Sequence, residues 1–476
     1  MRVTFRALVQ LAPALCLIGR VAADQSESEP VPLEFDQLEV IERDVAVIGG
    51  GSGGTYAAIR LRQLDKSVVV IEKEAKLGGH SNTYIDPHTG IPVEYGVKSF
   101  ANTSVVINYF AHFDIPLAAE NVGGNLSESV DFTTGKSITV VPIFLPPSDA
   151  KVSAALERYM GQLAKYPFLE DEYYHLSDPV PKDLLLPFGD FVAKHDLGAM
   201  VPLVAAYVFG FGDPLLKTTL YIMKTFNLHA IHGLQDGLVT YASHDNSELY
   251  KAAEKELGSD VLYQSTVTGA KRGINKMGNS SYILAHTPSG HKLIRAKKIL
   301  ITIPQTVENL MPFDLDKTEE AIFAQFAYTF YYTTVISNIY QSASVIYNHA
   351  CNTPYNLPSL PGVYGIFSTR VPDLKWVVYG SSTFMTNEEV KRDLVDNLLR
   401  IRHPNITVTQ PEVVAFQSHA PYELTVTGDA IQNGFYRQLE ALQGHRGTCY
   451  TGAALTVHES AVIWSFTEKL LLDHFV

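Results

Sequence analysis

Residues 44–54 read DVAVIGGGSGG, and no other stretch of this chain restricts the fold as strongly. The apolar run VAVI predicts a short buried strand of a parallel sheet. It leads directly into Gly49, Gly51 and Gly54, which are spaced as G-x-G-x-x-G, and a helix of small residues is expected over about 52–65. A strand, a glycine turn and a helix in this order are typical of a Rossmann-like domain.

Each glycine of this turn has a separate physical role. Gly49 permits the tight turn, Gly51 lets the backbone approach a pyrophosphate, and Gly54 lets the helix pack close to the strand. At the start of the helix, Ser52 and Gly53 present free N–H groups and a partial positive charge to phosphate oxygens. The turn therefore predicts a dinucleotide site.

A carboxylate follows at the distance that a ribose contact requires. The next strand is expected over 67–71, and it ends in Glu72, eighteen residues after Gly54. Such a carboxylate accepts hydrogen bonds from the ribose hydroxyls and disfavours a 2′-phosphate, so NADP is not expected here. We include Lys73, the next residue, in the predicted site. A glycine-rich surface loop is the alternative, but it does not explain why two strands, a helix and Glu72 are in register.

A second glycine pair suggests which dinucleotide is bound. Residues 77–83 read LGGHSNT, so that Glu72, Gly78, Gly79 and His80 form the pattern E-x(5)-GG-H. This pattern resembles the flavin-containing amine oxidase superfamily, most of whose amine oxidases have Arg after the glycine pair. The GGH-x-N-T form resembles the fungal secreted β-cyclopiazonate dehydrogenases and fatty-acid double-bond isomerases. The resemblance implies that FAD is the cofactor and that the glycine pair lies along its pyrophosphate.

The resemblance also places a second segment beside the flavin ring. Residues 91–97 read as a strand that leads into a glycine turn, and Gly96 and Val97 are expected to contact the ring through their backbone. Lys98 either contacts the ring or is a solvated loop charge. His80 is expected near FAD, either as a hydrogen-bonding group close to the ring or as a loop-packing donor.

Two later segments complete the FAD site that the resemblance implies. Val267 is expected to pair its backbone with the adenine end. Near the C-terminus a short strand ends in Gly452, and Val457 and His458 begin an apolar helix. In relatives this segment directs N–H groups toward the pyrophosphate and the O2 edge of the ring. A helix start there would stabilise negative charge on the reduced ring.

The predicted fold class is α/β, with a Rossmann-like FAD-binding domain on a parallel sheet interleaved with a substrate domain of mixed sheet and helices. We predict the domains as follows: a signal peptide at 1–23, the FAD-binding domain at 24–100, 230–305 and 440–476, and the substrate domain at 101–229 and 306–439.

Local patterns predict individual elements. Apolar residues at helical spacing predict helices over 153–166 and 188–207. A loop is expected to start at Gly233. A helix over 247–257 is expected next, capped by Asn246 and ended by Gly258. Further predicted elements are the strands 261–267, 297–303, 330–340 and 375–379.

Composition excludes several classes of protein. The chain has 476 residues, of which 46% are hydrophobic and only 18% are charged, so it is expected to be globular. The net charge of −13 argues against nucleic-acid partners and anionic membranes. No cysteine and histidine spacing suggests a metal site. The sequence leaves the oligomeric state open.

The N-terminus and four sequons predict entry into the secretory pathway. Residues 1–23 have a basic start, a short apolar stretch and a small-residue cleavage site near Ala23, and the apolar stretch is short for a membrane span. Two cysteines, Cys351 and Cys449, remain after cleavage, and the sequence leaves open whether they pair. The N-glycosylation sequons lie at Asn102, Asn125, Asn279 and Asn405.

Three functions follow from these observations as hypotheses. The first is dehydrogenation of a hydrophobic secondary metabolite of the indole or prenyl type, such as β-cyclopiazonate, with oxidative ring closure. The second is a related flavin reaction, either double-bond isomerisation of a polyunsaturated fatty acid or amine oxidation. The third is FAD binding without catalysis. No residue is identified as the catalytic acid or base.

Overall fold

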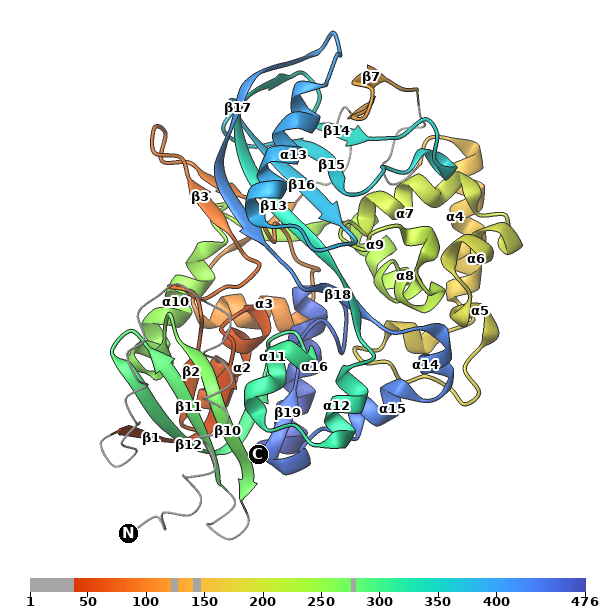
Figure 1. The fold of residues 1–476 in the computed structure, drawn as a ribbon. Helices are drawn as coiled ribbons and strands as arrows, with labels where there is room; N and C mark the ends of the chain where they lie inside the picture. Colours follow the sequence, from red (N-terminus) through yellow and green to blue (C-terminus); the bar gives the residue numbers. More distant parts are fainter. Residues whose placement is uncertain (1–37, 121–126, 140–146, 275–279) are drawn as a thin grey trace, which may run out of the picture.

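The structure is a computed structural model, and it describes residues 38–120, 127–139, 147–274 and 280–476. The predicted signal peptide and the sequons at Asn125 and Asn279 lie outside these residues. Two large sheets organise the fold, one in the lower and one in the upper half of the view in Figure 1. No helix of the described part has the length and apolarity needed to cross a bilayer.

The lower sheet contains the strand of the glycine motif. Its order is β10-β11-β12-β1-β2-β9, and β19 pairs with the last residues of β12. The pairs β1–β12, β1–β2, β2–β9 and β12–β19 are parallel, so the predicted parallel sheet is present. The strands are β1 (Glu39–Ile48), β2 (Val68–Ile71), β9 (Val261–Leu262), β10 (Thr266–Ile274), β11 (Ser280–Thr287), β12 (Gly290–Ile301) and β19 (Thr448–Tyr450).

Side chains alternate between the two faces of the parallel strands. Both faces are apolar here, so helices pack against them. Val45 and Val47 of β1 pack into one apolar cluster, which contains Trp464, whereas Ala46 and Ile48 pack into a second cluster on the opposite face. Figure 1 shows α16 beside α2 in the same lobe as β1. The helices named on this side are α2 (Ser52–Gln63), α3 (Ser104–His112), α10 (Ser247–Leu257) and α16 (Ser460–His474).

The upper sheet has the order β17-β13-β16-β15-β14-β6-β7, and β18 pairs with β13. The β14–β6 pair is parallel and the other pairs are antiparallel, which agrees with the predicted mixed sheet. Its strands are β6 (Ser127–Asp131), β7 (Lys136–Ser137), β13 (Ala327–Gln341), β14 (Val345–Asn348), β15 (Gly362–Ser368), β16 (Leu374–Ser381), β17 (Ile406–Ser418) and β18 (Tyr422–Thr425).

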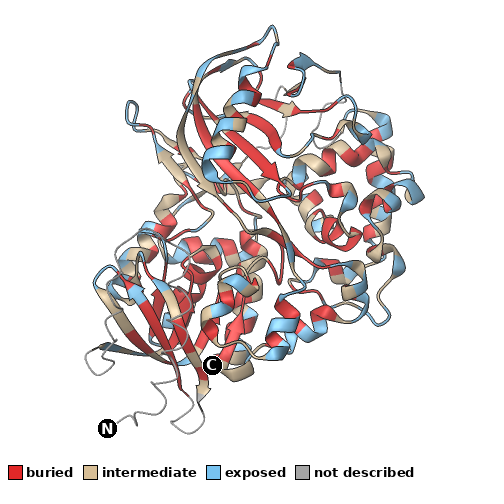
Figure 2. Cartoon of the chain, viewed as in Figure 1, coloured by how far each residue is buried: buried red, intermediate tan, exposed pale blue. Residues whose placement is uncertain are grey.

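The remaining helices flank the two sheets. In Figure 2 buried residues follow the strands of both sheets, and exposed residues lie on the outer helices. These helices are α4 (Ala150–Leu163), α5 (Lys182–Leu185), α6 (Phe188–His195), α7 (Val201–Tyr207), α8 (Thr219–Thr225), α9 (Leu228–Asp236), α11 (Val307–Leu310), α12 (Lys317–Phe323), α13 (Asn387–Leu399), α14 (Gly428–Gln432) and α15 (Phe435–Glu440), with 3-10 turns η5 (Pro214–Leu216), η9 (Pro354–Asn356) and η10 (His445–Gly447). The remaining two-stranded sheets pair β3 (Thr83–Ile85) with β4 (Pro92–Glu94) and β5 (Leu117–Glu120) with β8 (Leu238–Tyr241).

Several local predictions were wrong. Gly233 lies inside α9 and does not start a loop; the helix ends at Asp236, where Gly237 has φ +101°. The segment predicted as one helix over 188–207 forms α6 and α7, because Asp196 leaves helical geometry at φ +53°. The strand predicted over 261–267 is divided between β9 and β10.

The start of α10 differs from the prediction, whereas its extent agrees with it. Asn246 does not cap the helix; its side chain donates to the Val97 carbonyl instead. The first N–H of the helix, at Ser247, is accepted by the Asp245 carboxylate at 2.9 Å. Gly258 follows the last residue with φ +55°, as predicted.

Candidate functional site

The first glycine turn contains glycines of two kinds. A Cβ at Gly54 would lie 1.9 Å from the Gly49 carbonyl oxygen, and Gly49 itself has φ +102°, so the fold requires glycine at both positions. Gly51 has φ −68° and ψ −172°, which any residue can adopt. A Cβ at Gly51 would meet nothing closer than the Gly79 Cα at 3.8 Å. The space beside Gly51 therefore fits the close approach of a pyrophosphate.

The residues after this turn join two distant helices. No side chain within the described segments caps α2, which leaves its first N–H groups available to an anion. The Ser52 and Ser460 hydroxyl oxygens lie 3.1 Å apart, and the Trp464 indole N–H donates to the Ser52 carbonyl at 3.2 Å. A Cβ at Gly53 would lie 2.9 Å from the Ile463 Cγ2. The C-terminal segment is thereby held beside the glycine turn.

Glu72 is buried with both carboxylate oxygens engaged by backbone. Its Oε2 accepts the Gly50 N–H at 2.5 Å and its Oε1 accepts the Glu74 N–H at 2.8 Å. Burial raises the pKa of Glu72, and these two hydrogen bonds oppose that shift. Because each carboxylate oxygen has two lone pairs, acceptor capacity remains for ribose hydroxyls. Lys73 is exposed beside it.

The second glycine pair lies against the first turn. The Gly78 N–H donates to the Gly50 carbonyl at 2.9 Å, and Gly51 and Gly78 form a parallel bridge. Gly79 has φ +54°, and a Cβ there would lie 2.9 Å from the Gly51 Cα. Only glycine allows the two turns to approach this closely, as a shared pyrophosphate site requires.

The predicted ring-side turn contacts the glycine pair through His80. The Val97 N–H donates to the His80 carbonyl at 3.2 Å, and a Cβ at Gly96 would lie 1.9 Å from that oxygen. Lys98 is half-buried, with its Nζ 3.9 Å from the centre of the Trp376 ring. Burial lowers the pKa of Lys98 to about 8. Lys98 is therefore partly withdrawn from water and lies beside Trp376 of the upper sheet, and no ion pair joins it to a carboxylate in the described part of the chain.

The predicted adenine-side strand begins next to the Glu72 loop. The Ser265 N–H donates to the Glu72 carbonyl at 2.8 Å. Val267 pairs with Ala285 of β11, and a bulge follows it before Gly269. Val267 lies near the start of β10, and the residue before β10 contacts the loop that follows β2. This position is compatible with the predicted pairing of Val267 with the adenine end.

The C-terminal segment departs from the prediction in one respect. Gly452 follows β19 with φ +115°, and Val457 is buried. Helix α16, however, begins at Ser460, and the Glu459 carboxylate accepts the N–H groups of residues 461 and 462 at 3.0 and 2.9 Å. A carboxylate already caps these N–H groups, so the prediction that this helix start stabilises negative charge was wrong.

Three imidazoles from three distant segments gather next to the glycine pair. The ring centres of His80 and His419 lie 4.0 Å apart and those of His80 and His458 lie 6.1 Å apart, with all three rings nearly parallel. Tyr422 stacks on His458 with ring centres 3.8 Å apart, and the ring centres of Tyr331 and Tyr422 lie 4.9 Å apart. His419 was not predicted, because no motif marks it.

Burial keeps these imidazoles neutral near pH 7. It lowers the pKa of His80 to about 4, and it lowers the pKa values of His419 and His458 well below 6.5, with the neighbouring imidazoles adding to the shift of both. The His458 Nε2 accepts the Glu423 backbone N–H at 3.0 Å, so its Nδ1 carries the proton. The Asn82 amide is likewise 3.3 Å from the His419 Nε2. The cluster can therefore offer neutral N–H donors.

Glu423 places a buried carboxyl beside this cluster. Its Oε2 lies 3.7 Å from the His458 Nε2 and has no hydrogen-bond partner among the described residues. Burial raises the pKa of Glu423 to about 8, against a smaller opposing effect of Lys217. Glu423 was not predicted either; its backbone, at φ +51°, is rarely adopted by a glutamate.

A cavity of about 540 Å³ lies between the flanking helices and the upper sheet. It lies next to Tyr422 and Tyr331, which border the imidazole cluster: the hydroxyl oxygen of the lining residue Thr329 is 3.1 Å from the Tyr422 carbonyl oxygen, and the lining residue Tyr364 packs near Tyr331 with ring centres 6.5 Å apart. Its lining is largely apolar, with Phe209, Phe211, Leu215, Leu357, Leu360 and Tyr364 among its members. These features suit a hydrophobic ligand.

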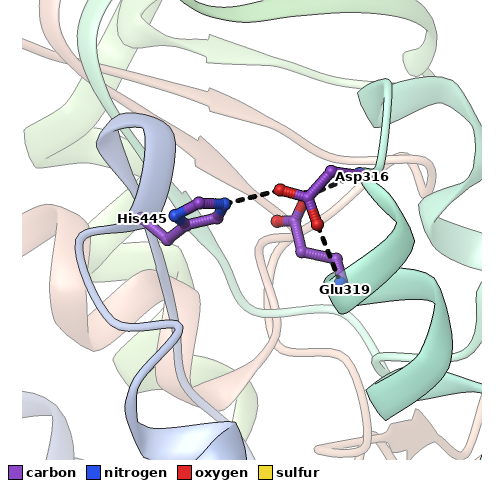
Figure 3. A group of neighbouring side chains, drawn as sticks. All are labelled: Asp316, Glu319 and His445. Atoms are coloured by element: carbon purple, nitrogen blue, oxygen red, sulfur yellow. Dashed lines mark hydrogen bonds and ion pairs between the residues drawn. The ribbon is translucent and has the colours of Figure 1, made fainter.

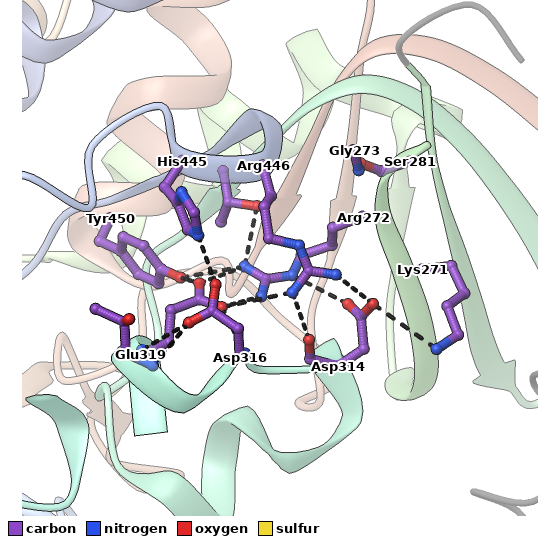
Figure 4. Close-up of polar contacts among 12 residues, drawn as sticks. Lys271, Arg272, Gly273, Ser281, Asp314, Asp316, Glu319, His445, Arg446 and Tyr450 are labelled. Carbon is purple, nitrogen blue, oxygen red and sulfur yellow. Dashed lines mark hydrogen bonds and ion pairs between the residues drawn. The ribbon is translucent and has the colours of Figure 1, made fainter. Parts of the chain in front are cut away.

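A second group of possible ligand atoms comes from Asp316, Glu319 and His445 (Figure 3). The His445 Nε2 lies 2.7 Å from the Asp316 Oδ2, and the Asp316 Oδ1 accepts N–H groups of α12. Figure 4 shows Arg272 and Arg446 beside the group. Arg272 pairs with Glu319 at 2.5 Å, and neither side chain is exposed. Because Arg272 and Arg446 pair with Glu319 and the Asp316 carboxylate caps α12, we assign the group to a structural network.

Other predicted residues lie away from the site. Cys351 is exposed and Cys449 is buried, and both are free thiols. Asn102 and Asn405 are exposed. Tyr332 is a core residue of the upper sheet, whereas Tyr331 and Tyr422 border the imidazole cluster.

Comparison with known proteins agrees with this geometry. The sequence profile described as an NAD(P)-binding Rossmann-like domain matches residues 47–113. The chain is 38% identical to the FAD-dependent oxidoreductase oblC of Cochliobolus heterostrophus, over 92% of both chains. It is 32% identical to the β-cyclopiazonate dehydrogenase of Aspergillus flavus, over 91% of this chain and 93% of that protein.

Solved structures show a similar fold at low sequence identity. A fatty acid isomerase from P. acnes that produces CLA superposes with a TM-score of 0.73 and 18% identity, covering 91% of this chain and 99% of that one. A putrescine oxidase bound to putrescine superposes with a TM-score of 0.66 and 14% identity, over 91% and 99% of the two chains.

Proposed function

Because this chain belongs to the FAD-dependent oxidoreductases that include β-cyclopiazonate dehydrogenase, we propose that it dehydrogenates a hydrophobic, ring-containing secondary metabolite. Indole and prenyl groups are the substrate features that we favour, and ring closure can follow the oxidation. The cofactor is FAD. The electron acceptor that reoxidises it is left open.

The position of the cavity carries this proposal. Thr329 and Tyr364 line it, and these two residues contact Tyr422 and Tyr331, which border the rings beside His80. His80 follows the glycine pair that we assign to the FAD pyrophosphate. We propose that the inner end of the cavity points toward the predicted flavin position, with Tyr331 and Tyr422 between the two.

The residues of this chain then have distinct roles. Bound FAD supplies the redox chemistry by accepting two electrons from a substrate C–H bond. We assign Gly51, Gly79 and the start of α2 to the pyrophosphate, and Glu72 to the ribose. The neutral His458 Nδ1–H is a donor for charge that develops in the reaction. The tyrosines around it exclude water.

We also propose that the mature protein is secreted and glycosylated. Exposure of Asn102 and Asn405 supports this assignment, because an acceptor asparagine must be accessible. Mass spectrometry of secreted protein before and after glycosidase treatment tests it. A cytosolic protein with an intact N-terminus would contradict it.

Gly51 provides the sharpest test of the cofactor site. Neither backbone conformation nor packing requires glycine at this position, so Gly51→Val should fold with nearly wild-type stability and lose the flavin absorbance near 450 nm. Gly161→Val is the matched control, because a Cβ at Gly161 meets nothing within 4 Å and a Cβ at Gly51 meets only the Gly79 Cα, at 3.8 Å. Full flavin retention in Gly51→Val would refute the assigned site, and Glu72→Ala should weaken FAD binding independently.

Anaerobic mixing with candidate substrates distinguishes the reactions. A dehydrogenase bleaches the flavin when substrate is added without oxygen. A double-bond isomerase of the kind that the fold also supports would turn over fatty acid without net bleaching. Bleaching by amines alone would indicate an amine oxidase. Stable FAD with no reaction toward any class would indicate a binding protein.

A further inference from the structure

Lys98 belongs to the ring-side turn, residues 96–98, and its side chain reaches the upper sheet. We propose that its ammonium group compensates the negative charge that the FAD ring takes on when it is reduced, and that Trp376 positions this ammonium group. The inference rests on the proposed function, because it requires FAD in the assigned site. It names two residues of this chain that tune the cofactor.

The order of contacts along the site places Lys98 at its ring end. Glu72 is assigned to the ribose and the two glycine turns to the pyrophosphate, so the ring of an extended FAD lies beyond the glycine pair, on the side away from Glu72. His80 follows that pair, and its carbonyl accepts the Val97 N–H at 3.2 Å. Lys98 is the next residue, so its backbone lies beside the predicted ring position.

Other segments hold the backbone around Lys98. The Thr240 hydroxyl of β8 donates to the Lys98 carbonyl at 2.9 Å. The Asn246 amide donates to the carbonyl of the preceding residue, Val97. The side chain of Lys98 therefore starts from a fixed point, and the position of its ammonium group depends on what the side chain contacts.

Trp376 supplies that contact from the upper sheet. The Lys98 Nζ lies 3.9 Å from the centre of the Trp376 ring, which is the geometry of a cation–π interaction. On β16, Trp376 pairs with Val335 of β13 and with Phe367 of β15, and its ring packs near the Phe367 ring with centres 4.5 Å apart. The indole is thus fixed between two neighbouring strands, and it holds the ammonium group between the ring-side turn and the sheet.

Lys98 is largely charged at neutral pH although it is half-buried. Burial lowers the pKa of Lys98 to about 8, and the neighbouring Glu94 and Glu120 oppose that shift. Of these two carboxyls, Glu94 is only partly ionised near pH 7, because burial raises its pKa to about 7. A partly dehydrated cation interacts more strongly with a nearby negative charge than a solvated one does.

Two other sources of positive charge at the site do not serve the ring. The Glu459 carboxylate caps the start of α16, so the N–H groups expected to face the ring are already occupied. The imidazoles of His80, His419 and His458 are neutral near pH 7, because burial lowers their pKa values. Compensation of charge on the ring is thereby left to Lys98.

Redox titration of the FAD-loaded protein tests the inference without substrate. The two-electron midpoint potential of the wild type should exceed that of free FAD measured alongside, because the cation favours the reduced, negatively charged ring. Lys98→Met keeps the apolar stem and should lower the potential by about 30 mV, which corresponds to a tenfold change in the equilibrium. Lys98→Arg should restore it. Lys255→Met, which removes an exposed lysine of α10, should leave it unchanged.

Sulfite provides a second measurement. Its sulfur forms a bond to N5 of the oxidised ring, and sulfite supplies the electron pair of that bond. Negative charge therefore moves onto the ring, and no further oxidant or reductant is needed. The loss of flavin absorbance should give a dissociation constant for sulfite that is about tenfold larger in Lys98→Met than in the wild type.

Trp376 is tested as a positioning residue. Trp376→Phe keeps an aromatic face for the ammonium group and should retain the wild-type potential, whereas Trp376→Leu should lower the potential toward that of Lys98→Met. If these two residues served only to pack the two sheets together, their variants would lose stability without a change in potential or in sulfite affinity. That result would overturn the inference.

A wild-type potential no higher than that of free FAD would overturn the inference as well. This comparison needs no variant, so it decides even where Lys98→Met or Trp376→Leu loses FAD or unfolds. A chain that takes up no FAD refutes the proposed function instead, whereas a yellow protein with the potential of free FAD refutes only the role of Lys98.

Discussion

The Nε2 atom of His458 accepts the backbone N–H of Glu423 at 3.0 Å, and this contact determines which nitrogen of the ring carries its proton. A backbone N–H can only donate, so the imidazole must accept at Nε2 and donate at Nδ1. Stacking against Tyr422 holds the ring in place, and burial keeps it neutral. The same neutral donor is present over the whole pH range above the lowered pKa.

Replacing His458 by Phe should keep the stacking on Tyr422 and remove the Nδ1–H donor. We expect flavin content to stay near that of the wild type, while the rate of anaerobic flavin reduction falls about 10²-fold. Stopped-flow absorbance measures this rate. His175→Phe, at an exposed histidine, is the control. An unchanged rate would remove His458 from the chemistry.

Gly79→Ala should abolish stable FAD binding, because its Cβ would lie 2.9 Å from the Gly51 Cα in addition to the cost of φ +54°. Gly90→Ala isolates the backbone cost: Gly90 has φ +71°, and a Cβ there meets nothing within 4 Å. That control should lose about 1 kcal/mol of stability and keep its flavin. Comparable flavin loss in both variants would argue against crowding at the glycine pair.

Glu94 should make the protein less stable as pH rises. Burial raises the pKa of Glu94 from its ordinary 4.5 to about 7. The unfolded chain therefore releases this proton at lower pH than the folded chain does, and the associated stability, complete below pH 4.5, is lost as pH rises to 7. Glu94→Gln mimics the protonated form. The unfolding free energy of the variant minus that of the wild type should therefore increase by about 2 kcal/mol when the pH is raised from 5 to 8.

Denaturant titrations at both pH values measure this gain. Glu388→Gln, at a highly exposed carboxylate, should show no comparable pH-dependent difference. A constant offset between Glu94→Gln and the wild type at all pH values would show that Glu94 is already ionised in the fold.

Arg272→Met should destabilise the fold by about 3 kcal/mol, because it leaves the Glu319 carboxylate buried without its bidentate partner. The double variant Arg272→Met/Glu319→Leu should be less destabilised than the single one. Arg437→Met breaks an exposed pair with Asp178 and should cost less than about 1 kcal/mol. Equal losses from the buried and exposed pairs, in thermal or denaturant unfolding, would contradict the network's assigned role.

The local geometry around the predicted cofactor site could be anticipated from the sequence, because its parts are local. The turn from Gly49 to Gly54, the glycine pair and Glu72 each require particular residue types over a few positions, and the strands beside them are marked by unbroken apolar runs. Positions that depend on competing partners were less predictable. Asn246 precedes a helix as a cap would, yet its amide binds the Val97 carbonyl, and the Asp245 carboxylate accepts the first N–H of the helix.

The linear sequence alone determined the Rossmann-like fold, the dinucleotide turn and the FAD family. Each of these motifs depends on residue types at positions close together in the sequence, so it can be recognised without knowing how the rest of the chain packs. Only the tertiary structure decided that His419 and Glu423 join His80 and His458, and that Lys98 lies against Trp376 of the upper sheet. These residues are far apart in the chain, and their meeting depends on how two sheets and the intervening helices pack. No local pattern encodes that packing, so burial, tautomer and charge at the candidate site emerge only from the folded chain.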